Sequence, residues 1–355
     1  MPMAPPPPPG ILIGASAGGI EPLTRLARDL PSDLPAAVVV VVHLPASTRS
    51  VLPEILDRVG ALPARAAADA QPLRAGTISV APPDHHLEVA DGHLRLTRGP
   101  KENGLRPAID VLFRTAAEAL SERAVGVVLS GALDDGTTGL REIKRRGGYA
   151  IVQEPEEAVN PSMPLSAVRR VAVDGVLRSG DMAATLIGLA NRMSEHARSG
   201  PRSAGNGDLG ATGGASAAQG AAGATDELAR GRPTPLTCPE CGGMLSEQTN
   251  GDVARYECHV GHGFAEDSLL EAQGADLERA LYTALRTLQE RIAFLEGLAA
   301  RQREAGNAYS ARLFEDRAGE AREHVRTIEA VVAQPGLDLE LGSGAGPTAA
   351  PAGDG

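Results

Sequence analysis

The chain has 355 residues, a formal net charge of −11 and only 2% aromatic residues. The acidic balance argues against a nucleic-acid-binding protein, because phosphate neutralisation needs clustered Lys and Arg. No apolar run approaches the ~20 residues of a transmembrane helix, the proline tract at residues 5–9 is not a secretory signal, and three cysteines cannot form a disulfide framework. We therefore expect a cytoplasmic protein with no membrane insertion.

The first half of the chain alternates apolar runs with helical periods. The run of valines ending at Val42 has no polar face, as is typical of a central parallel strand. Asp91-Gly92 between two alternating runs in residues 77–98 predicts a β-hairpin. We therefore predict an α/β fold, a doubly wound, mostly parallel sheet with an inserted β-hairpin, over residues 10–195. Its strands are expected at 11–13, 36–42, 125–129 and 150–152, and its helices at 21–30, 51–59, 109–120 and 140–146.

The second half divides by composition. Residues 196–234 are dominated by Gly, Ala and Ser, which predicts a flexible linker that uncouples the C-terminal segments from the first domain. Residues 235–264 contain all the cysteines, and residues 335–355 are expected to be a disordered tail. Leucines spaced three or four residues apart predict an α-helical hairpin over 265–334, with its turn at Gly306-Asn307.

A candidate nucleophile, Ser16, lies where the first predicted strand meets the first helix, in Gly14-Ala15-Ser16-Ala17-Gly18-Gly19. Small residues allow a tight turn with the serine Oγ exposed, and free amides at a helix N-terminus can stabilise an oxyanion. The same residues fit a plain helix N-cap. The segment lacks the lysine of a P-loop and the glycine pattern of a dinucleotide fold, which leaves nucleotide binding a minor alternative.

Other polar residues follow the neighbouring predicted strands. His43 ends the valine strand, and Asp134-Asp135-Gly136 follows the strand at 125–129 by one short loop. The carboxyl ends of parallel strands form the ligand-binding edge of such sheets. A serine, a histidine base and an orienting carboxylate at one edge indicate nucleophilic catalysis. The alternatives are a core-edge histidine and a turn aspartate. His86 is expected in a solvated turn.

Five motifs, in order over roughly residues 10–195, resemble the catalytic domain of the CheB family, the protein-glutamate methylesterases of bacterial chemotaxis. They are Ile13 to Gly19, His43-Leu44-Pro45, Val80 to His86, Arg106 to Phe113 and Leu129 to Gly136.

The resemblance implies a doubly wound α/β domain that hydrolyses glutamate γ-methyl esters on methylated chemoreceptors, often with deamidation of receptor glutamines. It places the nucleophile at Ser16, the base at His43 and the orienting acid at Asp135, leaving Asp134 as a solvated turn residue. The substrate and oxyanion region would comprise Ala17, Gly18, Gly19, Gly131 and Ala132.

The sequence departs from the family at three points. Ala17 stands where members often have Thr, and Ala132-Leu133 where they often have Met-Gly. No receiver domain precedes Ile11, so we expect activity insensitive to small phosphodonors. The alternative function is a catalytically weak signalling scaffold or binding protein that keeps the fold.

The cysteines predict a metal site. Cys238 and Cys241 form a Cys-x-x-Cys pair followed by glycines, and Cys258 and His262 supply a second pair. Four such ligands suit tetrahedral zinc in a closed, structural site, and no cofactor is expected for catalysis. The alternatives are a redox Cys-x-x-Cys, and His259 in place of His262 as fourth ligand.

Overall fold

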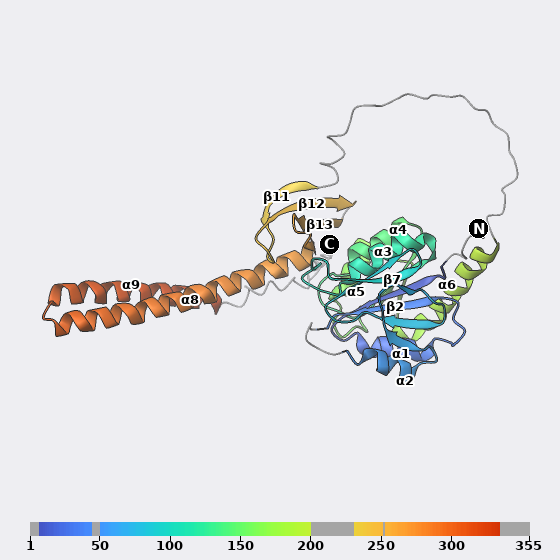
Figure 1. Cartoon of the computed structure of the whole chain (residues 1–355), viewed down its shortest axis with the longest axis horizontal. Coiled ribbons are helices and arrows are strands. Elements are labelled where there is room, and N and C mark those ends of the chain that lie inside the picture. Colours follow the sequence, from blue (N-terminus) through green and yellow to red (C-terminus); the bar gives the residue numbers. More distant parts are fainter. Residues whose placement is uncertain (1–6, 45–49, 200–230, 251–252, 334–355) are drawn as a thin grey trace, which may run out of the picture. The chain divides into compact units, whose positions relative to one another are not determined.

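The computed structural model describes residues 7–44, 50–199, 231–250 and 253–333. They divide into two compact units, one through Leu269 and one from Leu270. The first unit contains an α/β domain, residues 7–199, and a small antiparallel sheet, residues 232–265, which we call the ribbon module (Figure 1).

The α/β domain is built on a seven-stranded sheet whose neighbouring strands all pair in parallel. The strand order is β10 (Gly175–Leu177), β9 (Tyr149–Gln153), β8 (Ala124–Val128), β1 (Gly10–Ala15), β2 (Ala37–Val42), β5 (Thr77–Val80) and β3 (Ala64–Ala66). The predicted doubly wound sheet is confirmed, and the valine run is β2, buried throughout.

Helices cover both faces of the sheet, as Figure 1 shows. Alternate residues of each central strand face opposite ways, so Ile11 and Ile13 of β1 join one core and Leu12 joins the other. One core takes in α1 (Ile20–Asp29), α2 (Leu52–Val59) and α6 (Ser179–Ser199). The other takes in α3 (Ile109–Leu120), α4 (Thr137–Arg145) and α5 (Ser162–Arg170).

The inserted hairpin is confirmed as β6 (His86–Ala90) and β7 (His93–Thr97), joined by Asp91 and Gly92. Both turn residues have positive φ, 49° and 73°, the geometry of a tight two-residue hairpin turn. The short β4 (Gln71–Pro72) completes this sheet, while β5, predicted as part of the hairpin segment, belongs to the main sheet.

The ribbon module is a four-stranded sheet in the order β11 (Arg232–Thr237), β12 (Met244–Asn250), β13 (Val253–Cys258) and β14 (Gly263–Ala265). The two ends of the predicted linker, residues 196–234, belong to described elements, because α6 continues to Ser199 and β11 begins at Arg232. Residues 200–230 and the tail from 334 lie outside the described residues.

The second unit consists of two helices. α8 (Glu266–Glu304) begins in the first unit and continues into the second, and α9 (Ala308–Val332) returns after a short turn. The turn contains Gly306, with φ 78°, and Asn307, whose side chain caps α9. The predicted helical hairpin and its turn are confirmed. No helix in the described ranges is long and apolar enough to cross a membrane.

Candidate active site and metal-binding group

The carboxyl ends of three adjacent strands bring the candidate triad together. Ala15 pairs with Val42, so Ser16 and His43 leave neighbouring strands side by side, and the His43 amide donates to the Ala15 carbonyl at 3.2 Å. β8 flanks β1 on its other side, and the loop after it carries Asp135. The Ser16 amide donates to Ser130 of that loop at 2.9 Å, which fixes the turn between them.

His43 and Asp135 are in direct contact. His43 Nε2 lies 2.8 Å from Asp135 Oδ2, the carboxylate is 1% exposed, and the imidazole is 9% exposed. With Nε2 donating to the carboxylate, the nitrogen left to accept a proton is Nδ1. The buried Asp135 carboxylate therefore fixes the orientation of the His43 ring. His43 and the half-buried Ser16 lie at the same edge of the sheet.

The carboxylate of Asp135 sits at the N-terminus of α3. It accepts hydrogen bonds from the amides of Ile109 at 2.6 Å and Asp110 at 3.1 Å, and from the side chain of Asn103 at 2.8 Å. These first amides of a helix have no partner within the helix, and they face a negative charge favourably. These donors compensate the burial of the Asp135 carboxylate.

Burial shifts the pKa of two neighbouring titratable groups, Asp110 and His86, towards their uncharged forms. Burial and the charge of Asp135 raise the pKa of Asp110 well above its ordinary value, and its carboxyl accepts from the Gly139 amide at 2.6 Å. Burial lowers the pKa of His86. His86 is 2% exposed and bonds the Pro100 carbonyl and the Ala108 amide, so the expectation of a solvated turn was wrong.

The small residues of the predicted oxyanion region differ in whether their backbone N–H groups already have an acceptor. The amides of Gly19 and Gly131 already donate to the Ser16 and Asn160 carbonyls. In the described part of the chain, the amides of Ala17 and Gly18 have no acceptor, so they are the better oxyanion donors. The turn needs the φ of 77° at Gly18, a conformation that glycine adopts without strain.

Gly131 has a steric role. A Cβ at this position would lie 2.0 Å from the Met163 sulfur and 2.9 Å from the Ser16 Cβ. The chain after β8 therefore passes Ser16 at a distance that only glycine permits. Ala132, also predicted here, is exposed at the same loop.

Asp134 differs from expectation. It is 0% exposed and accepts from the Ser268 hydroxyl and the Asp267 amide at the start of α8, with Arg170 3.3 Å away. Burial raises its pKa to about 6. The prediction of a solvated turn residue was therefore wrong, because a segment 133 residues further along the chain covers it.

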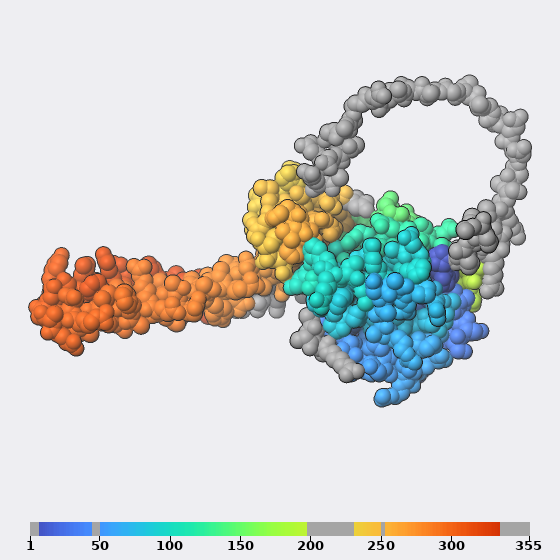
Figure 2. Space-filling view, viewed as in Figure 1, coloured from blue at the N-terminus to red at the C-terminus, as the bar shows by residue number. Residues whose placement is uncertain are grey.

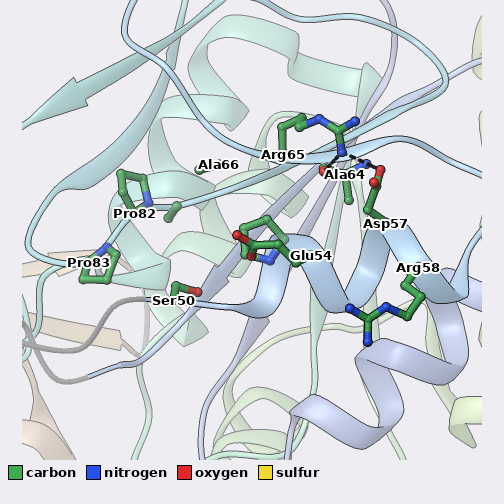
Figure 3. A pocket seen from close by; sticks show the side chains of 11 residues that line it. Ser50, Glu54, Asp57, Arg58, Ala64, Arg65, Ala66, Pro82 and Pro83 are labelled. Atoms are coloured by element: carbon green, nitrogen blue, oxygen red, sulfur yellow. Dashed lines mark hydrogen bonds and ion pairs between the residues drawn. The ribbon is translucent and has the colours of Figure 1, made fainter.

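A pocket continues the same edge of the sheet beyond β2. It is lined by α2 and by the ends of β3 and β5, including Ser50, Glu54, Pro82 and Pro83, and an ion pair between Arg65 and Asp57 borders it (Figure 3). None of the three triad residues lines it. The pocket therefore lies beside the edge strand β3, and its lining mixes prolines and alanines with charged side chains.

The ribbon module brings four ligand atoms together. One atom each from Cys238, Cys241, Cys258 and His262 lies within 4.8 Å of the others. His262 Nδ1 is 3.7 Å from the Cys238 sulfur and 3.6 Å from the Cys258 sulfur. A group of this composition could hold a metal ion. His259 instead lies against Gly243, outside the group.

Asn103 and Asp110 are site residues that the sequence analysis missed. Asp110 lies within the recognised Arg106 to Phe113 motif and Asn103 lies three residues before it, but only the fold shows that both contact Asp135. A buried amide three residues before an Arg-Pro pair gives no signal in the sequence.

Comparison with known proteins gives one consistent family. The family described as CheB methylesterase matches residues 11–186. A protein-glutamate methylesterase/protein-glutamine glutaminase of Symbiobacterium thermophilum is 39% identical over 168 residues, 47% of this chain and 46% of that protein. A putative enzyme of the same name from Leptospira interrogans is 38% identical over 168 residues, which is 87% of its length.

A solved structure agrees. The CheB methylesterase catalytic domain of Thermotoga maritima superposes with a TM-score of 0.50 at 32% identity, covering 51% of this chain and 98% of that domain. Several of the curated relatives are longer, and the chain spans about half their length.

Proposed function

We propose that this chain, which belongs to the CheB methylesterase family, is a serine hydrolase that removes methyl esters from glutamate side chains of a protein. The hydrogen bond of 2.8 Å between His43 and Asp135, beside Ser16 at one sheet edge, carries the proposal. A scaffold without catalysis would have no need of a buried carboxylate holding the histidine ring.

In the proposed mechanism, Ser16 Oγ attacks the γ-carbonyl carbon of the methylated glutamate while His43 Nδ1 takes the hydroxyl proton. The amides of Ala17 and Gly18 stabilise the oxyanion. His43 then gives the proton to the methoxy group, which leaves as methanol. Water, deprotonated by His43, then attacks the acyl carbon, and His43 returns the proton to Ser16 Oγ as the glutamate carboxylate is released. Asp135 stabilises the imidazolium in both steps.

The proposed substrate is a methylated chemoreceptor or a related signalling protein. The names of the relatives refer to both methylesterase and glutaminase reactions on proteins. The glutaminase reaction needs the same acyl-enzyme step, with ammonia in place of methanol as the leaving group.

The test is methanol release from methylated receptor membranes by the full chain and by Ser16→Ala. Methanol release by the wild type and none by a folded Ser16→Ala protein would support the proposal. A wild-type protein that releases no methanol, although it is folded and metal-loaded, would contradict it.

The ribbon module is proposed to bind one structural Zn²⁺ through Cys238, Cys241, Cys258 and His262. Three thiols and one imidazole nitrogen suit tetrahedral zinc, and four protein ligands leave no open position for substrate. The ion would supply cross-linking only. All three cysteines are free thiols, and thiolate ligation suits a reducing compartment such as the cytoplasm, where we place the protein.

A further inference from the structure

The loop before α3 is shared between the α/β domain and the ribbon module. The backbone N–H of Asn103 donates to the Gly263 carbonyl at 2.7 Å, and the backbone N–H of Gly263 donates to the Lys101 carbonyl at 3.3 Å. Glu102 and Gly263 form a parallel bridge, so residues 101–103 extend the edge of the ribbon module at β14. In Figure 2 the yellow surface of the module adjoins the teal surface of the α/β domain.

The side chain of Asn103 connects the module to the triad. It is 7% exposed, its Oδ1 accepts from the Ala265 amide at 2.7 Å, and its Nδ2 donates to Asp135 Oδ1 at 2.8 Å. Nδ2 also lies 3.2 Å from Asp110 Oδ2. Reversing the amide would set Nδ2 against the Ala265 N–H and Oδ1 against the Asp135 carboxylate. The backbone of β14 therefore determines that Asn103 presents a donor to the catalytic acid.

Buried ion pairs secure the same interface. Glu102 accepts two hydrogen bonds of 2.8 Å from Arg114 of α3 and lies 3.3 Å from Arg255 of β13. Its carboxylate is 7% exposed, so water does not replace either partner. On the other side of Asp135, Asp134 holds the first turn of α8 through Asp267 and Ser268.

The metal-binding group lies directly before β14. His262 precedes Gly263, and the Cys258 amide donates to the His262 carbonyl at 3.0 Å, which closes the turn between β13 and β14. A metal held by Cys258 and His262 would fix that turn, and with it the strand that bonds Asn103. A module of 34 residues has little core of its own and depends on such a cross-link for its order.

We infer that the metal-loaded ribbon module positions the catalytic acid: β14 orients Asn103, and Asn103 holds Asp135 in the geometry that serves His43. This inference deepens the proposed function and rests on it. Asn103 is a positioning residue and takes no part in proton transfer. The sequence predicted that the linker uncouples the ribbon module from the α/β domain. We infer coupling instead, because the module is hydrogen-bonded to the loop beside the triad.

The first test compares three variants of the full chain in methanol release. Asn103→Asp keeps an acceptor for the Ala265 amide but turns a carboxylate oxygen towards Asp135, and Asn103→Ala removes both contacts. Each should lower kcat by about 100-fold, the scale of a misplaced catalytic group, with KM unchanged. Lys101→Ala is the matched control, because it removes only the exposed ion pair with Glu240 at the same interface and should keep wild-type kcat. Wild-type kcat in both Asn103 variants would overturn the inference.

The second test removes the metal from the wild-type full chain with a chelator. It follows hydrogen exchange at the backbone N–H of Asn103 together with kcat. Faster exchange and a lower kcat, both restored by Zn²⁺, are expected, and Asn103→Ala should lose no further activity on chelation. An Asn103 amide that stays protected in the metal-free protein would overturn the inference. Hydrogen exchange can be measured even if the protein hydrolyses no ester. Failure of the proposed function can therefore be distinguished from failure of this inference.

Discussion

The guanidinium of Arg255, in the ribbon module, lies 3.3 Å from the buried carboxylate of Glu102, in the α/β domain. The two residues are 153 positions apart in the chain, and the carboxylate also pairs with Arg114. Together, Arg255 and Arg114 hold the pKa of Glu102 down at about 2, against the opposing effect of burial. The interface between the two sheets therefore contains a charge whose neutralisation should weaken it.

This ion pair predicts a specific loss of stability in acid. The folded pKa of Glu102 lies below its ordinary value of 4.5, so its contribution is complete above pH 4.5 and is lost as the pH falls towards 2. The loss amounts to about 3 kcal/mol. Asp110 also faces Glu102, and burial raises its pKa well above its ordinary value. Glu257 pairs with Arg255 at the same place.

Glu102→Gln should remove that pH dependence and lower the free energy of unfolding at pH 7 by about 3 kcal/mol, because Arg114 loses its carboxylate partner and Arg255 keeps only Glu257. Urea unfolding at pH 7, 4.5 and 3 measures both effects. Glu118→Gln, at an exposed pair with Arg146, is the control and should follow the wild type. Parallel pH curves for wild type and Glu102→Gln would contradict the prediction.

Ser16→Ala should abolish ester hydrolysis, by about 10⁴-fold or more, and leave the melting temperature within a few degrees of the wild type. The side chain is half-buried, and its removal leaves the turn bonds of the Ser16 amide and carbonyl intact. Ser32→Ala, at an exposed loop position, should keep full activity. Turnover by a folded Ser16→Ala protein would remove Ser16 from the mechanism.

The two adjacent aspartates should respond differently to the same substitution. Asp135→Asn should lower kcat by about 10⁴-fold, because the neutral amide no longer stabilises the imidazolium of His43. It should also lower the free energy of unfolding by about 1–3 kcal/mol, since the new NH2 group faces N–H donors that the carboxylate accepted. Asp134→Asn should lower the free energy of unfolding by about 1–2 kcal/mol, since one carbonyl oxygen cannot serve Asp267, Ser268 and Arg170 together. Its kcat should fall by less than tenfold. Methanol release and urea unfolding of both variants measure these effects. A larger loss of kcat in Asp134→Asn than in Asp135→Asn would assign the orienting acid to Asp134.

Local patterns were sufficient to predict the elements that carry the site. The valine run, the small-residue turn at Ser16 and the Asp-Gly hairpin each indicate structure through neighbouring residues alone, and the parallel sheet then brings His43 and Asp135 together. α5 and α6 escaped prediction because their apolar residues are interrupted by Ser, Pro and Gly.

Long-range contacts could not be predicted from the sequence. The burial of Asp134 depends on Ser268, and the orientation of Asn103 depends on Ala265. Asp-Gly indicates a turn and Asn a loop residue wherever they occur, so only tertiary structure distinguishes a solvated polar group from one covered by a distant segment. The Gly/Ala/Ser composition of the intervening residues suggested separation, whereas β14 pairs with the loop at residues 101–103.

The last prediction concerns the fourth metal ligand. His262→Ala should lose stoichiometric zinc, because His262 Nδ1 lies among the three sulfurs, whereas His259→Ala should keep it, because His259 lies against Gly243. Metal analysis of both proteins, purified with reductant and without chelator, gives the stoichiometry.

Losing one of four ligands should also lower the stability of the ribbon module, whose folding free energy is coupled to the metal. The burial that raises the pKa of the Cys238 thiol to about 11 disfavours a free thiolate there, and a zinc ion would offset that cost. Zinc content near zero in His259→Ala with full content in His262→Ala would exchange the two histidines, and no zinc in the wild type would remove the site.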